Sequence, residues 1–247
     1  MIHLSLGAYR GLGHEEAVRQ SQKVTVKDPV LGLVGTNVLQ LCPQGRDALS
    51  EETCGRLVET YPHLKFRPHA NIRVDEKLKV VDAVSILSDE DYVTKVGVAC
   101  KTLKADGYIM HPGLKVLGSL SQVIDACKTL SDRYGIAVGV EGMYPALRLK
   151  YHLSTWGEYQ ILLSAGAHFC IDLSHLNILK NSTGFVPMSL VRELLSHPLC
   201  LEVHVSGNDG HSDQHRPIEE SVWWLPLMKD VNPNALVFYE GYQAVVS

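Results

Sequence analysis

The sequence lacks any long apolar run, and this absence excludes an integral membrane protein. No stretch approaches the roughly 18 uncharged apolar residues that a membrane-spanning helix requires. The first thirteen residues have neither the basic start nor the long apolar centre of a secretory signal peptide, so we expect a cytoplasmic protein with no membrane partner. Charged residues make up only 20% of the chain and apolar residues 45%, which excludes a largely disordered protein.

Two further absences concern ligands and the redox compartment. No block of basic residues stands out among the 23 Lys and Arg, so a broad nucleic-acid surface is not visible. No two of the six cysteines form a C-x-x-C pair, and most lie inside apolar runs. We therefore predict buried cysteines in a reducing compartment, without disulfides or a zinc knuckle. The six are Cys42, Cys54, Cys100, Cys127, Cys170 and Cys200.

What the sequence does have is a regular alternation of short apolar runs with longer amphipathic ones. The short runs have the length and composition of β-strands. They cover residues 2–8, 37–42, 65–72, 107–111, 137–141, 169–172, 200–205 and 236–240. The amphipathic stretches predict helices over residues 88–104, 119–134, 155–165, 187–195 and 219–228. Strands that alternate with helices imply a parallel sheet with right-handed crossovers.

Two parallel architectures fit this alternation: a doubly wound sheet and a closed barrel. No G-x-G-x-x-G motif follows the first strand, because Gly7, Gly11 and Gly13 do not have that spacing, and this weighs against a dinucleotide-binding sheet. Eight strands in 247 residues favour a (β/α)8 TIM barrel, an α/β fold that forms a single domain over residues 1–247. Only residues 241–247 follow the last strand, so we expect a barrel without a full C-terminal eighth helix.

Histidine, aspartate and glutamate residues recur where the predicted strands end. They are His69, His111, Glu141, Asp172, His175, His204, Asp213, His215 and Glu240. Any one of them alone is more often a structural residue than a ligand. Because the carboxyl ends of barrel strands meet on one rim, however, we expect all nine to converge. Gathering them without a counter-charge costs desolvation and repulsion, and divalent metal ions remove both costs. Imidazole and carboxylate ligands without thiolate suit zinc, manganese or iron.

The segments that carry these residues resemble the xylose isomerase-like TIM-barrel superfamily, and within it the AP endonuclease family 2 group typified by endonuclease IV. The resemblance covers about two-thirds of the chain, from His69 to Glu240. Its more specific features are the Asp213-Gln214-His215 segment and the strand-end Asp172 followed by His175. It implies that all nine residues are ligands, that Glu141 and Glu240 bridge ions, and that each chain holds two or three ions, with zinc as the leading choice.

The residues after His204 depart from the nuclease pattern. Asn208-Asp209-Gly210 looks more like the sugar (phosphate) isomerase and epimerase relatives, which generally hold one metal with two Glu, one Asp and one His. The corresponding residues here are Glu141, Asp172, His204 and Glu240. A further group of related barrels holds iron and oxidises cysteine in peptides, and the same set of side chains would serve iron as well.

The resemblance therefore implies an enzyme, either a metal-dependent hydrolase of phosphoesters or an isomerase. In the hydrolase, Glu141 would orient or deprotonate the nucleophile, and basic residues would bind phosphate. The candidates are Arg67, Lys115 and Arg216. In the isomerase or epimerase, Glu141 and Glu240 would exchange a proton as base and acid, and His175 would bind substrate oxygens.

The substrate implied by these hypotheses is a small phosphorylated or sugar-like molecule, or a nucleic acid with an abasic or nicked site. A homo-oligomer is left open, because a missing eighth helix would leave one side of the barrel for another subunit to cover.

Overall fold

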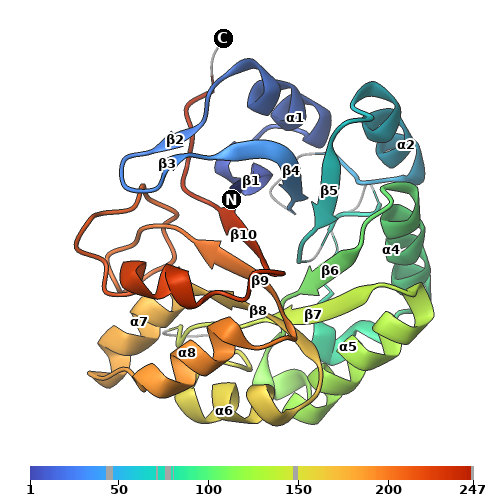
Figure 1. Cartoon of the computed structure of the whole chain (residues 1–247). Coiled ribbons are helices and arrows are strands. Elements are labelled where there is room, and N and C mark those ends of the chain that lie inside the picture. The colour runs from blue at the N-terminus through green and yellow to red at the C-terminus, as the bar shows by residue number, and fades with distance from the viewer. Residues whose placement is uncertain (43–46, 71, 76–78, 80, 147–149, 246–247) are drawn as a thin grey trace.

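The computed structural model describes residues 1–42, 47–70, 72–75, 79, 81–146 and 150–245, and it shows eight parallel strands arranged as a barrel (Figure 1). The strands are β1 (Ile2–Ser5), β4 (Gly35–Leu41), β5 (Lys65–Pro68), β6 (Gly107–Met110), β7 (Ala137–Glu141), β8 (His168–Asp172), β9 (Cys200–Val205) and β10 (Leu236–Tyr239). They lie in the order β5-β4-β1-β10-β9-β8-β7-β6, and each hydrogen-bonded neighbour pair is parallel. The predicted barrel and all eight predicted strands are confirmed.

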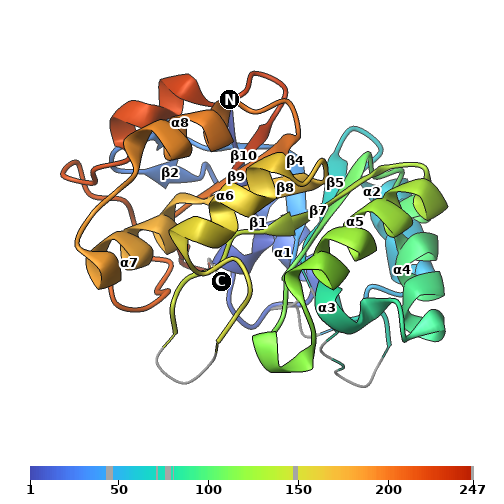
Figure 2. The same cartoon turned by 90° about the horizontal axis from the view of Figure 1, so that it is seen from below.

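Helices cover the outside of the barrel, as two views at right angles show (Figures 1 and 2). They are α1 (His14–Lys23), α2 (Glu51–Thr60), α3 (Ala83–Ile86), α4 (Glu90–Thr102), α5 (Leu120–Tyr134), α6 (Trp156–Ser164), α7 (Leu173–Thr183) and α8 (Met188–Ser196), with short 3-10 turns η1 (Leu6–Ala8), η2 (Lys115–Leu117) and η3 (Leu225–Asp230). In α5 the buried residues follow helical spacing and face the sheet. They are Val123, Ala126, Cys127 and Leu130. A capping box between Ser119 and Gln122 starts this helix, and Gly135, in a left-handed conformation, ends it.

One predicted helix is wrong, and four of the described helices were not predicted. Residues 219–224 form turns, followed by the 3-10 turn η3 over Leu225–Asp230. Pro226 explains this, because it has no backbone N–H to continue an α-helical ladder. The helices α1, α2, α3 and α7 were not predicted. α7 follows β8 with no intervening loop, and Asp172 serves both as the last residue of the strand and as the N-cap of the helix.

The described residues after β10, 241–245, form no helix, as predicted. A hairpin of β2 (Lys27–Asp28) and β3 (Gly32–Leu33) packs near this side of the barrel instead. The Asp28 carboxylate is buried and accepts hydrogen bonds from the backbone N–H groups of Val30, Leu31 and Ile218 at 2.9–3.0 Å. Burial, together with the Asp28 charge, raises the pKa of Tyr239 on β10. The chain therefore covers its last strand with a segment from between β1 and β4.

The barrel closes least regularly between β5 and β6. These strands share no hydrogen-bonded ladder over Lys65–Pro68 and Gly107–Met110. One bridge, between His69 and Ile109, joins them just beyond the end of β5, and the Ala70 N–H donates to the Ile109 carbonyl at 2.6 Å. At the other end, Arg67 on β5 forms an ion pair across the seam with Asp106 at 3.1 Å. Among the described residues, the β5–β6 seam is thus joined by one bridge at the rim and one ion pair at the opposite end.

The six cysteines are all buried and none forms a disulfide, as the sequence predicted. Burial raises the pKa of the Cys42 thiol to about 12, which keeps it neutral and unreactive. Within the described ranges, no helix has the length and apolar character needed to cross a membrane.

Candidate metal centre

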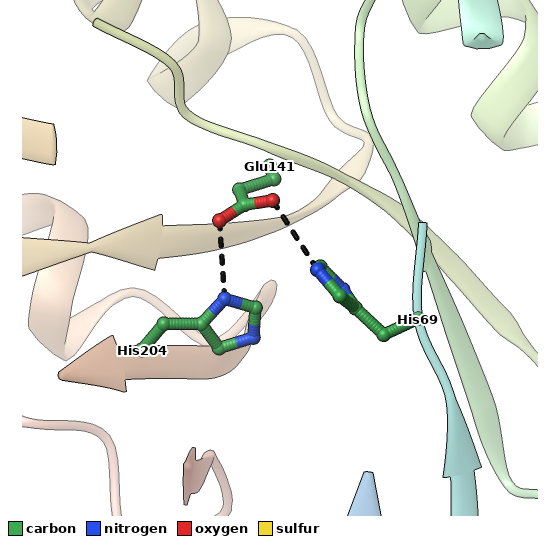
Figure 3. Close-up of side chains that lie close together, drawn as sticks. All are labelled: His69, Glu141 and His204. Atoms are coloured by element: carbon green, nitrogen blue, oxygen red, sulfur yellow. Dashed lines mark hydrogen bonds and ion pairs between the residues drawn. The ribbon is translucent and has the colours of Figure 1, made fainter. Parts of the chain in front are cut away.

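The nine predicted ligands lie at the carboxyl ends of strands β5 to β10 and in the loop after β9, with Glu141 at their centre. Glu141 ends β7 and is 2% exposed. Its Oε1 lies 3.1 Å from His204 Nδ1, and its Oε2 lies 3.1 Å from His111 Nε2 and 3.5 Å from His69 Nε2. Figure 3 shows the carboxylate between the rings of His69 and His204. One buried carboxylate therefore faces three imidazoles from three other strand ends.

We divide the nine residues into three groups of neighbouring donors, of which the first two share Glu141. Group one is His69, His111 and Glu141. Group two is Glu141, Asp172, His204 and Glu240. Group three is His175, Asp213 and His215. In group two, His204 Nδ1 lies 3.7 Å from Glu240 Oε1, and in group three Asp213 Oδ2 lies 3.6 Å from His175 Nε2 and 3.0 Å from His215 Nε2.

The orientation of His175 and Asp172 follows from the start of α7. Asp172 Oδ1 accepts from the N–H groups of Ser174 and His175 at 2.6 and 3.1 Å, so Oδ2 is left to face the site. His175 Nδ1 donates to the Gly142 carbonyl at 2.8 Å, because a carbonyl can only accept. Nε2 of His175 then points toward Asp172 Oδ2 at 3.5 Å and toward Asp213 Oδ2. Hydrogen bonds to the backbone thus orient both side chains toward the donor groups.

Several donor atoms of the described residues are free of hydrogen bonds or are spaced as ligands of one divalent cation would be. Glu141 Oε2, Asp172 Oδ2 and Asp213 Oδ1 are buried and accept no hydrogen bond from the described residues. Two ligands on a tetrahedral zinc, with bonds of about 2.0–2.1 Å, lie about 3.3 Å apart. Three contacts in the site, at 3.5, 3.5 and 3.6 Å, are near that spacing and exceed the roughly 2.7–2.9 Å of a charge-assisted hydrogen bond. The residues present therefore suit metal ions.

The pKa values of the buried groups in the site depend on one another. Burial disfavours the charge of Glu141, yet the surrounding His204, His111 and His69 hold the pKa of its carboxyl well below the usual range. Burial also opposes charge on His204, but nearby groups, Glu240 and Glu141 among them, raise its pKa well above 6.5. His69 differs, because burial dominates and lowers its pKa.

These shifts predict that metal binding displaces protons. Despite burial, neighbouring carboxylates raise the pKa of His175 well above 6.5 and that of His215 to about 9. The raised values mean that His175, His204 and His215 hold protons at pH 7, and a metal ion must remove them. We expect zinc affinity to fall at least about tenfold for each pH unit between pH 8 and 6. Calorimetry in buffers of different ionisation enthalpy measures the released protons. Binding without proton release would contradict the expectation.

The three basic residues proposed for substrate binding take different positions. The structure corrects the placement of Arg67: its guanidinium is buried in the barrel and forms an ion pair with Glu202 at 3.0 Å, besides the one with Asp106. Lys115 lies in η2 and pairs with Glu158 at 2.9 Å. Arg216 is exposed in the loop after β9, where its backbone pairs with that of Gly207. Arg67 is therefore not at the rim.

The sequence reading missed Glu202 and Gln40, two buried polar residues beneath the site. Glu202 Oε2 lies 3.1 Å from His204 Nε2, and Gln40 Nε2 donates to the same oxygen at 3.0 Å. The signal was present, because strand periodicity of two places Glu202 on the same face of β9 as His204. Cys170, Glu202 and His204 also lie close enough to hold an ion. There, however, Arg67 already balances the charge of Glu202.

Several solved structures share this fold. They include an AP endonuclease family 2 protein from Brucella melitensis, with a TM-score of 0.67 at 13% identity over 99% of this chain and 94% of that one. A D-tagatose 3-epimerase-like protein gives a TM-score of 0.66 at 15% identity over 98% and 91% of the two chains. A xylose isomerase domain containing protein from Salmonella typhimurium gives 0.62 at 15% identity over 98% and 89%.

No protein-family model matches the chain, and a sequence search of curated proteins finds no match. At identities of 13–15% the structural likeness establishes the fold. The fold and the rim residues together define a TIM barrel, similar in fold to those structures, that carries a cluster of His, Asp and Glu residues that could hold metal ions. Epimerase-like and endonuclease-like proteins both occur among its structural neighbours.

Proposed function

We propose that this protein is a metal-dependent hydrolase of phosphoesters that holds two or three divalent ions, zinc first among them. One observation carries the proposal: donors for more than one ion surround Glu141. A single-metal site needs only group two. The structure adds His69 and His111 on one side of Glu141 Oε2, and the Asp213 and His215 pair beside His175. Phosphoester hydrolysis is the reaction for which several adjacent ions have a clear use.

The chain's own residues divide the work around such ions. When bound, the ions would polarise a phosphoryl oxygen and lower the pKa of a water molecule to about 7. Glu141, with one oxygen toward group one and the other toward group two, would hold the two groups in fixed register and orient the nucleophile. His175, tied to the Gly142 carbonyl, would keep Nε2 directed at group three.

For the substrate we propose a small phosphorylated molecule rather than a nucleic acid. The chain carries a net charge of −4, and its sequence has no basic block that would follow a nucleic-acid backbone. Of the three basic candidates, Arg67 and Lys115 are engaged with carboxylates. A nucleic acid with an abasic or nicked site is the alternative substrate.

A second function is a single-metal sugar epimerase, and Glu240 favours it. Burial raises the pKa of the Glu240 carboxyl to about 7, against the opposing charges of His204 and His215. A carboxyl with such a pKa exists in both protonation states near neutral pH, as an acid–base catalyst requires. A D-tagatose 3-epimerase-like protein is also among the structural neighbours. In this reading Glu141 and Glu240 exchange the substrate proton, and group two holds the ion.

One experiment separates these functions. We expect elemental analysis of protein purified without chelator to give two or three ions per chain, and His69→Ala and His111→Ala each to lose about one. Hydrolysis of a chromogenic phosphodiester should fall roughly 100-fold or more in both variants, because each loses a ligand of an ion that contacts the reacting phosphate. His211→Ala, at an exposed loop position, is the matched control.

The outcomes are distinct. Full metal content in both variants would contradict the assignment of group one. One ion per chain, with deuterium exchange from solvent into a ketose that Glu240→Gln abolishes, would support the epimerase instead.

A further inference from the structure

A row of contacting charged side chains, buried except for the first, runs through the barrel interior beneath the metal centre. It starts at Asp106, which is exposed beside the amino-terminal end of β6, and continues to the buried Arg67 at 3.1 Å. Arg67 Nε then meets Glu202 Oε1 at 3.0 Å. Glu202 is fully buried, and its other oxygen, Oε2, lies 3.1 Å from His204 Nε2. This row of side chains thus ends at His204, a residue of group two.

A glycine on β6 leaves room for this row of side chains. A Cβ at Gly107 would lie 1.7 Å from Arg67 Nη1, so any other residue there would displace the guanidinium. Burying a carboxylate such as Glu202 costs several kcal/mol unless a partner compensates it. Arg67 is that partner, and it lies against the carboxylate directly beneath His204.

The two ring nitrogens of His204 have different neighbours. Nδ1 points up at Glu141 Oε1 and Glu240 Oε1, at 3.1 and 3.7 Å, where a metal ion would need its lone pair. Nε2 then carries the ring proton, and Glu202 Oε2 accepts it. The Gln40 amide nitrogen lies 3.0 Å from Glu202 Oε2 and 2.8 Å from His204 Nε2; it donates to Glu202, and it could donate to Nε2 only in the opposite tautomer, so Glu202 is the acceptor that faces an Nε2–H.

We propose that Glu202, held by Arg67, is a positioning residue that fixes the Nε2–H tautomer of His204 and so presents Nδ1 as a metal ligand. The inference rests on the metal site of the proposed function and adds a support that lies outside the nine rim residues. Carboxylates in this position hold a histidine ring in one orientation and strengthen it as a ligand, and their loss typically weakens metal affinity 10- to 100-fold.

The test uses two double variants that differ only in whether the side chain at position 202 can accept a hydrogen bond. Glu202→Leu with Arg67→Met removes both charges, so neither is left buried alone, and it removes the acceptor. Glu202→Gln with Arg67→Met removes the same charges but keeps an acceptor oxygen. We expect the Leu double variant to bind one zinc ion about 10- to 100-fold more weakly than the wild type. The Gln double variant should recover much of that loss.

Zinc affinity is measured by competition with a chromogenic chelator, and the visible spectrum of bound Co²⁺ reports the changed ligand. Thermal melting checks that both variants fold. Asp106→Asn changes the exposed residue at the far end of the row of side chains, and this control is expected to bind zinc as the wild type does. Wild-type affinity in a folded Leu double variant would overturn the proposal, as would equal weakening in both double variants.

The same experiment keeps the inference distinct from the proposed function. Should the wild type bind ions but hydrolyse no phosphodiester, while the two double variants still differ, the proposed function fails and the inference stands. An active wild type whose double variants bind zinc unchanged has the opposite meaning. A wild type that binds no zinc or Co²⁺ overturns both.

Discussion

Glu141→Gln is expected to remove ions from two donor groups at once and to lower phosphodiesterase kcat on the order of 1000-fold or more. The two oxygens of Glu141 face different groups, since Oε2 lies toward His69 and His111 and Oε1 toward His204. Glutamine replaces one of these oxygens with an amide nitrogen that has no lone pair to offer a metal. Metal content and kcat should therefore fall together, whereas loss of a peripheral ligand should cost one ion.

The measurement pairs elemental analysis with steady-state kinetics on the purified variant. Glu193→Gln, on the exposed side of α8, makes the same chemical change away from the site and should keep both metal content and kcat. Full metal content in Glu141→Gln would remove Glu141 from the centre of the cluster.

Chelation is expected to produce the largest change in stability. The rim gathers four carboxylates, Glu141, Asp172, Asp213 and Glu240, of which three are buried. An ion that binds only the folded chain stabilises it by about 4.1 kcal/mol when present at 1000 times its Kd. For a chain of 150–250 residues each kcal/mol changes Tm by about 2–4 °C, so we expect chelation to lower Tm by about 8–16 °C for each ion removed.

Calorimetric melting of the protein with EDTA, and again after zinc is restored in excess, measures this difference. His69→Ala serves as an internal control, because a chain that already lacks one ion should lose less on chelation. Coincident melting curves with and without metal would show that the cluster is held together without ions.

The strands and the rim residues could be predicted from the sequence because both depend on local patterns. Each strand is a short, nearly continuous apolar run of the kind that a parallel sheet buries on both faces. The positions of the predicted ligands followed from the predicted strand ends, because the carboxyl ends of barrel strands share one rim. Glu141 and Asp172 were placed correctly by this rule, as the last residues of β7 and β8.

What could not be predicted depends on contacts between distant segments. The partner of Arg67 is Glu202, far along the sequence, and only the closed barrel brings the two together. Arg67 lies two residues before His69, so both side chains are on the inner face of the barrel and that of Arg67 lies deeper than the rim. The cover of β10 by the β2–β3 hairpin has the same origin, because Asp28 reaches Ile218 only in the folded chain.

The β5–β6 seam lies directly beneath one side of the candidate metal centre. In the part of the chain that the structure describes, the two strands share a single bridge where the other neighbouring strands of the barrel share ladders. His69 stands just past the end of β5 and His111 just past the end of β6, and both direct Nε2 at the same oxygen of Glu141. An ion held there would clasp the two strand ends together. Metal binding would then add a link between β5 and β6 at the point where the backbone joins them least.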